Sequence, residues 1–335
     1  MSYTPNLKRY NQLNYRRCGH SGLQLPPITL GLWHNFGGKN MSNESKKMIF
    51  RAFDRGVTHF DLANNYGPPY GSSEINFGKL TSSDLKPFRD ELIISTKAGY
   101  DMWPGPYGEW GSKKYLMASL DQSLKRMQLE YVDIFYSHRF DPDTPLDETL
   151  GALDTAVSQG KALYAGISSY LADQTREAVQ VTKDHGFSPL AIHQPNYSML
   201  NRWIEKGLMD VCGELGLGMI AFCPLFQGLL TDKYLGGISD GSRASLEHSP
   251  LRKSEVNEQN LRVINELNDH AKERGQSLAQ MAVSWVLRDE RVTSALIGAS
   301  RPEQILENCE ATKQTDFSDD ELAKLDRILA KANLP

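Results

Sequence analysis

A repeating pattern most restricts how this 335-residue chain can fold: a short apolar segment, a polar loop and an amphipathic segment follow one another eight times. The apolar segments lie at residues 28–33, 57–62, 92–97, 132–138, 162–168, 191–195, 217–223 and 293–298. Amphipathic segments between them include residues 45–56, 113–127, 146–160 and 202–216, and several end at glycine, as helices often do. Short buried strands alternating with helices predict a parallel sheet, and eight such units have the size of a (β/α)8 TIM barrel.

A doubly wound sheet is the competing fold for such a pattern. It favours a GxGxxG motif directly after the first strand, where the helix N-terminus binds phosphate. Here the first apolar segment is followed by HNFGGKNMSNE, and GELGLG (213–218) precedes a strand. The barrel is therefore the better interpretation.

Three segments depart from the repeat. Residues of about 14–27 predict an N-terminal hairpin with the turn GHSG, and residues of about 224–256 form a long loop with little periodicity. A serine–aspartate capping signal begins an added C-terminal helix at about 318–332. We expect residues 1–335 to form a single barrel domain.

Composition excludes several classes of protein. A net charge of −4 gives no basic field for nucleic acid or an anionic membrane, and no apolar run approaches the roughly 20 residues of a membrane span. The first residues lack the apolar core of a signal peptide. The cysteines are scattered and the histidines show no ligand spacing, so we expect a cytoplasmic protein with no metal site.

Polar side chains gather at the predicted strand ends, where barrel enzymes build their active sites. The stretch FDLANNYG supplies Asp61 and Tyr66, and the next two strands end at Lys97 and His138. Each residue alone has a simpler interpretation, namely a turn aspartate, a solvated lysine or a structural histidine. Together they suit proton transfer: Lys97 lowers the pKa of the Tyr66 phenol, Asp61 keeps Lys97 charged, and neutral His138 donates to a carbonyl oxygen.

These four residues resemble the Asp-Tyr-Lys-His tetrad of the aldo-keto reductase superfamily, and the resemblance covers nearly the whole chain. Segments such as GLWHNFG and HFDLANNYGPPYGS are similar to its bacterial L-glyceraldehyde 3-phosphate (methylglyoxal) reductase branch, which is related to potassium-channel β-subunits. The resemblance implies NADPH-dependent reduction of small aldehydes with Tyr66 as general acid. An NADPH-binding regulatory subunit is the alternative, whereas a metal-dependent barrel lyase lacks its carboxylate and histidine clusters.

The resemblance also implies an extended NADPH across the barrel top. Ser168 and Gln194 would hold the carboxamide, Phe222 would stack on the nicotinamide, and Ser169 is a further cofactor position. Further cofactor positions carried over from the family are Trp33, Asp61, Cys223, Pro224, Leu225, Gln227, Gly228, Lys233, Arg243, Gly298, Ser300, Arg301, Gln304, Glu307 and Asn308. Three positions depart from much of the family: Ser169 replaces Asn, Phe222 replaces Tyr or Trp, and Gln304 replaces Arg. Without the resemblance, SRPEQ (300–304) is an ordinary helix start.

The candidate substrate residues are Trp33, Tyr66, Trp103, His138 and Arg139. Aromatic side chains of the loop after the third strand would narrow a small pocket, and an arginine would grip a terminal phosphate. A solvated surface loop is the alternative. The family resemblance further implies a homo-oligomer, a tetramer or octamer.

Overall fold

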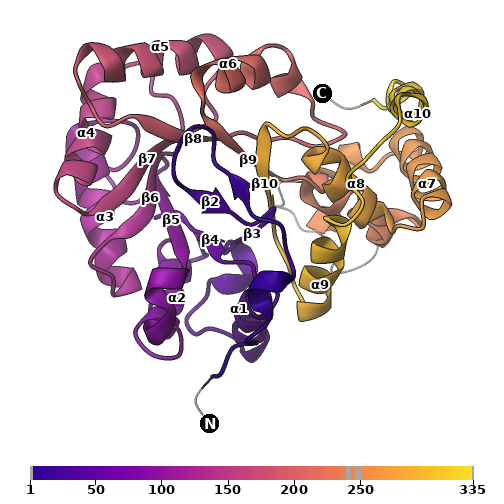
Figure 1. Ribbon diagram of the computed structural model, residues 1–335, viewed down its shortest axis with the longest axis horizontal. Helices are drawn as coiled ribbons and strands as arrows, with labels where there is room; N and C mark the ends of the chain where they lie inside the picture. The colour runs from indigo at the N-terminus through magenta and orange to yellow at the C-terminus, as the bar shows by residue number, and fades with distance from the viewer. Residues whose placement is uncertain (1–2, 239–242, 246–250, 334–335) are drawn as a thin grey trace.

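The computed structural model describes residues 3–238, 243–245 and 251–333. Within them, eight parallel strands close into a barrel in the order β10-β3-β4-β5-β6-β7-β8-β9, which confirms the (β/α)8 prediction (Figure 1). The strands are β3 (Ile28–Gly31), β4 (His59–Asp61), β5 (Ile93–Ala98), β6 (Val132–Ser137), β7 (Ala162–Ser168), β8 (Leu190–Gln194), β9 (Gly218–Phe222) and β10 (Val292–Ile297).

Helices surround this barrel. They are α1 (Asn43–Asp54), α2 (Ser72–Thr81), α3 (Lys113–Met127), α4 (Leu146–Ser158), α5 (Ala172–Asp184), α6 (Leu208–Leu215), α7 (Glu258–Glu273), α8 (Leu278–Leu287), α9 (Pro302–Ala311) and α10 (Asp319–Leu329). Serine side chains cap several of them: Ser42 accepts from the Ser45 amide, and Ser112 accepts from the Tyr115 amide. These bonds satisfy backbone donors that have no partner inside the helix.

One predicted helix is wrong in its extent. The segment 202–216 divides into a short 3-10 turn, Trp203–Glu205, and the helix α6, which begins after Gly207. Gly207 has φ of 106° and ends the first turn in a backbone conformation that only glycine adopts readily. The apolar periodicity continues across this break, so the sequence pattern alone did not reveal it.

The predicted N-terminal hairpin is present and covers one end of the barrel (Figure 1). Its strands β1 (Arg16–Arg17) and β2 (Gln24–Leu25) pair antiparallel. Cys18, Leu23 and Leu25 pack in a cluster with Ile134 and Ile192 of the barrel strands. The approach is so close that a Cβ at Gly218 would lie 2.2 Å from the Cys18 sulfur. The strands end at the opposite side of the barrel, which the hairpin leaves open, and the candidate functional side chains lie there.

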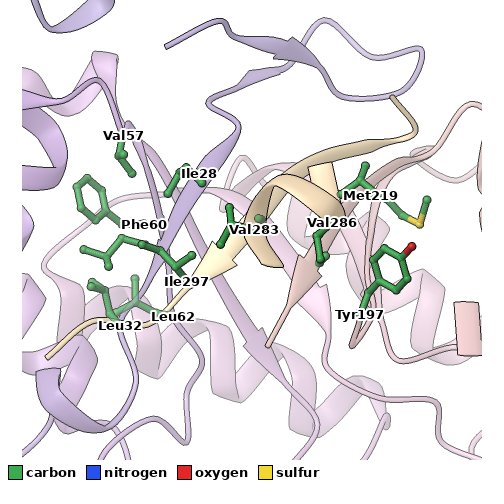
Figure 2. Packing of buried hydrophobic residues seen from close by; sticks show 14 of the residues in the cluster. Ile28, Leu32, Val57, Phe60, Leu62, Tyr197, Met219, Val283, Val286 and Ile297 are labelled. Atoms are coloured by element: carbon green, nitrogen blue, oxygen red, sulfur yellow. The ribbon is translucent and has the colours of Figure 1, made fainter. Parts of the chain in front are cut away.

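The main apolar core lies between the barrel and its helices. Figure 2 shows part of it, with Val283 and Val286 of α8 lying among Ile28, Phe60 and Met219 of the strands. All five side chains are buried. This layer fixes the strand positions and therefore the spacing of the residues at their ends.

The segment after β9 contains short 3-10 turns at Phe226–Gly228, Asp232–Tyr234, Arg243–Ser245 and Lys253–Glu255. Helices α7 and α10 pack against each other beside the barrel (Figure 1). Across the part of the chain that the structure describes, every helix is too short or too polar to cross a membrane.

Candidate active site

A buried ion pair lies at the carboxyl ends of β4 and β5. The Lys97 ammonium donates to Asp61 Oδ2 at 2.5 Å and to the Leu62 carbonyl at 2.7 Å. Both charged side chains have 0% exposure. Parallel pairing explains their proximity, because Asp61 is level with Ser95 and Lys97 lies two residues further along β5. Burial lowers the pKa of Lys97 and the Asp61 charge opposes that shift.

Tyr66 follows in the loop after β4 and is half-buried. Lys97 Nζ donates to the Tyr66 hydroxyl oxygen at 3.3 Å. Because the oxygen accepts this bond, the phenolic proton points away from the ammonium and is available to another acceptor. The Tyr66 ring lies 5.8 Å from the Trp33 ring and 6.1 Å from the His138 ring, so these three rings surround one region of the barrel top.

His138 stands directly after β6. Burial, reinforced by the charges of Lys97 and Arg139, holds the pKa of His138 well below its usual 6.5, so the ring is neutral. Its Nδ1 is buried without a partner among the described residues. A buried lone pair without a donor costs less than a buried N–H without an acceptor, which favours the tautomer protonated on Nε2. His138 Nε2 is then a hydrogen-bond donor, the role that polarisation of a carbonyl requires.

The electrostatics of Tyr66 differ from the sequence-based expectation. We expected Lys97 to lower the pKa of Tyr66, but burial, with a further contribution from the Asp61 charge, raises this pKa well above 10. The physical reason is that Lys97 shares its charge with Asp61, which lies closer to it than the phenol oxygen does. The phenol therefore stays protonated at neutral pH, as a proton donor must.

The predicted nicotinamide residues lie at the ends of β7, β8 and β9. Ser168 donates to the Gln194 carbonyl at 2.8 Å, and Gln194 Nε2 donates to Asp61 Oδ1 at 3.2 Å. Gln194 is thus in direct contact with the tetrad. Ser169 has φ of 60° and Phe222 is half-buried at the end of β9, so its ring is not part of the closed core.

The segment after β9 has an unusual backbone. Cys223, Phe226 and Gln227 have positive φ values of 57°, 44° and 56°, and Gly228 follows at 96°. Such strained conformations in non-glycine residues concentrate at functional sites. Pro224 is buried and Leu225 is half-buried in the same segment. Lys233 is exposed, whereas the Arg243 side chain lies outside the described residues.

The cofactor positions from Gly298 to Asn308, where the family resemblance implies a site for the adenosine 2′-phosphate, lie just before and within α9. Ser300 and Arg301 are exposed, and a Cβ at Gly298 would meet open space. Gln304 accepts from the Ser300 amide at 2.8 Å, while the buried Asn308 Oδ1 has no partner among the described residues. The Ser300 hydroxyl also donates to Gln304 Oε1, at 3.1 Å, so a phosphate bound at this helix start would contact the exposed Arg301 or displace Gln304. The Glu307 carboxylate accepts a hydrogen bond from the Ser277 hydroxyl at 2.5 Å.

The candidate substrate residues divide into two groups. Trp33 is 39% exposed beside Tyr66, whereas Trp103 packs on Tyr115 of α3 with ring centroids 5.2 Å apart and thus joins the main apolar core. Arg139 donates to the Gly99 carbonyl at 2.8 Å and to Glu109 at 2.7 Å. A phosphate held by Arg139 would therefore have to displace Glu109.

Sequence reasoning missed several residues around the tetrad. Ser95 donates to Asp61 Oδ1 at 2.6 Å, and the Tyr100 ring lies edge-on to His138 at 4.7 Å. The Trp110 ring covers the Arg139 guanidinium at 3.4 Å. Strand periodicity could have found Ser95, which lies two residues before Lys97 and shares its face. Nothing in the sequence placed Tyr100, whereas Trp110 belongs to the loop whose aromatic side chains were expected to narrow the pocket.

The fold and the side chains at its strand ends define a barrel enzyme with a buried lysine–aspartate pair beside a tyrosine and a neutral histidine. Residues 27–330 match the model of the Aldo/keto reductase family, and the chain belongs to that family. It is therefore an oxidoreductase, and members of this family use nicotinamide cofactors.

Two curated relatives from Escherichia coli, of strains O157:H7 and K12, each carry the name L-glyceraldehyde 3-phosphate reductase. Each is 56% identical to this chain over 338 residues, covering 100% of the chain and 97% of the relative. The similarity thus extends from the hairpin to the terminal helix.

Proposed function

We propose that this chain catalyses the NADPH-dependent reduction of small aldehydes, including L-glyceraldehyde 3-phosphate and methylglyoxal. The observation that carries the proposal is the 3.3 Å hydrogen bond from Lys97 to the Tyr66 oxygen, which leaves the phenolic proton to a carbonyl acceptor. The names of the two Escherichia coli relatives support the phosphorylated substrate. When bound, NADPH supplies the hydride.

The residues of this chain perform the proton chemistry. The Nε2–H of His138 donates to the carbonyl oxygen and orients it toward Tyr66. Tyr66 then transfers its proton to that oxygen as negative charge develops there. Lys97 stabilises the phenolate that remains, and Asp61 keeps the Lys97 ammonium in place through their 2.5 Å contact.

The cofactor assignment rests on three groups of residues. Ser168 and Gln194 would hold the carboxamide, with Ser169 beside them, and Phe222 would stack on the ring. The strained segment 223–228 would line the pyrophosphate. The exposed start of α9, with Ser300 and Arg301, would bind the 2′-phosphate, which is why we propose NADPH over NADH.

Steady-state oxidation of NADPH tests this proposal. A panel of L-glyceraldehyde 3-phosphate, unphosphorylated glyceraldehyde, methylglyoxal and a bulky steroid ketone should rank the three-carbon aldehydes first. Binding of NADPH without turnover of any aldehyde would contradict the proposal and favour a cofactor-binding regulatory protein.

A second measurement tests whether Arg139 grips the substrate phosphate. Glu109→Gln removes the carboxylate that now occupies Arg139, so it should lower KM for L-glyceraldehyde 3-phosphate and leave KM for methylglyoxal unchanged. Arg139→Ala should raise the first KM only. Equal effects of either variant on both substrates would show that Arg139 only orders its loop.

Two expectations of the sequence remain proposals: a cytoplasmic location and a homo-oligomer, either a tetramer or an octamer. Light scattering of the purified protein measures the second directly, and a monomeric mass would contradict it.

A further inference from the structure

A continuous chain of hydrogen bonds runs through the barrel interior and ends at the tetrad. Ser294 Oγ contacts Thr29 Oγ1 at 2.8 Å, and Thr29 Oγ1 contacts His59 Nδ1 at 3.0 Å. His59 Nε2 contacts Ser95 Oγ at 2.9 Å, and Ser95 Oγ donates to Asp61 Oδ1 at 2.6 Å. All five side chains have 0% exposure.

The strand order explains why these residues meet. They come from β10, β3, β4 and β5, which are consecutive neighbours in the barrel. His59 and Asp61 lie two residues apart on β4 and therefore share its inner face, as Ser95 and Lys97 do on β5. Barrel interiors are usually filled by bulky branched side chains. A polar chain in this position therefore differs from ordinary barrel packing.

The negative charge of Asp61 determines which group donates in each hydrogen bond of this series. The Asp61 carboxylate, which is ion-paired with Lys97, can only accept hydrogen bonds, so the Ser95 hydroxyl donates its one proton to Asp61. Ser95 must then accept from His59, which carries its proton on Nε2. His59 Nδ1 is consequently an acceptor, so Thr29 donates to it, and Thr29 in turn accepts from Ser294. Burial lowers the pKa of His59 to about 4, which agrees with a neutral ring.

We propose that this series of hydrogen bonds orients the Asp61 carboxylate, with His59 and Ser95 as positioning residues for the reaction. Ser95 and Gln194 hold Oδ1, which leaves Oδ2 directed at Lys97. Lys97 is thereby fixed relative to the Tyr66 hydroxyl. His59 acts on Asp61 indirectly: its Nε2–H donates to Ser95 Oγ and so prevents the Ser95 hydroxyl from rotating its proton away from Asp61. The inference deepens the proposed function and rests on it for its kinetic test.

Paired substitutions separate positioning from simple core stability. Ser95→Ala removes the donor to Asp61, and His59→Leu removes the donor to Ser95. Each should lower kcat about ten- to a hundredfold at saturating NADPH, with little change in aldehyde KM or in the NADPH Kd. Ser95→Thr keeps a hydroxyl, and His59→Gln places an amide donor near the position of Nε2, so both should recover much of the lost kcat.

Ser284 of α8 provides a matched control. Like Ser95, it is fully buried, accepts one hydrogen bond, from Gln276, and donates another, to the Ala311 carbonyl. Ser284→Ala should lower stability and leave kcat unchanged. Wild-type kcat in Ser95→Ala overturns the proposal. So does a loss in Ser284→Ala as large as that in Ser95→Ala.

The protonation state of His59 gives a test that needs no turnover. Nitrogen-15 NMR of the wild-type protein, with His59→Gln used to assign the resonances, should show a neutral ring protonated on Nε2 from pH 5 to 8. A ring protonated on Nδ1 would overturn the proposal even if Ser95→Ala and His59→Leu failed to fold. If the wild-type protein reduced no aldehyde, the proposed function would fail, while this measurement would still decide the direction of the chain.

Discussion

Replacing Lys97 by methionine separates the structural cost of the buried ion pair from its role in catalysis. The Lys97 and Asp61 side chains are both fully buried, so Lys97→Met leaves a carboxylate in the protein interior with only its Ser95 and Gln194 hydrogen bonds. Breaking one partner of a buried pair costs about 3–5 kcal/mol, because the remaining charge is uncompensated. We therefore expect the free energy of unfolding to fall by about that amount.

The double variant Asp61→Asn/Lys97→Met removes both charges. Asparagine Oδ1 still accepts from Ser95, so most of the lost stability should return, whereas aldehyde reduction should not. Urea unfolding followed by circular dichroism measures the stabilities, and NADPH oxidation measures the activity.

Lys161→Met is the matched control for this prediction. Lys161 pairs with Asp121 at 2.7 Å, but these side chains are 32% and 48% exposed. Exposed pairs contribute at most about 1 kcal/mol, so the same substitution there should change stability little. Equal losses in Lys97→Met and Lys161→Met would refute the reasoning from burial. A double variant as unstable as Lys97→Met would show that the cost does not come from the Asp61 charge.

Three further predictions concern proton donation, the cofactor and pH. Tyr66→Phe should lower kcat by roughly 10²–10⁴-fold while NADPH still binds, because only the proton donor is lost; near-normal turnover would exclude this role. Arg301→Ala should reduce the preference for NADPH over NADH by about 1.5–3 kcal/mol and leave kcat/KM with NADH unchanged; no preference in the wild type would exclude a 2′-phosphate site there. Burial lowers the pKa of His193 from 6.5 to about 4, so the unfolded chain binds a proton that the folded chain excludes, and stability should fall as pH drops from 6.5 toward 4 by up to about 1.4 kcal/mol per pH unit. Buried His59 and His138 contribute in the same direction, so His193→Gln should reduce the slope in urea unfolding without abolishing it. His185→Gln at an exposed position is the control, and an unchanged slope in His193→Gln would show that His193 titrates normally.

The barrel and the residues at its strand ends were predictable from the sequence because each depends on local order along the chain. Buried strands alternate with helices at a regular spacing, and the chemistry follows directly after the apolar segments. Asp61, Lys97 and His138 could therefore be assigned to one end of the barrel before any contact was known. The split of 202–216 at Gly207 escaped the same reasoning, because apolar periodicity does not record a change in backbone conformation.

Tertiary structure alone decided how these side chains interact. The pKa of Tyr66 is raised rather than lowered, because burial and the Asp61 charge raise it while the Lys97 ammonium is paired with Asp61. Arg139 is occupied by Glu109 and the Gly99 carbonyl, partners that no spacing indicated. The hydrogen bonds from Ser294 to Asp61 join residues that lie far apart in sequence. Such contacts, and the burial that shifts a pKa, depend on distances that strand pairing and packing set.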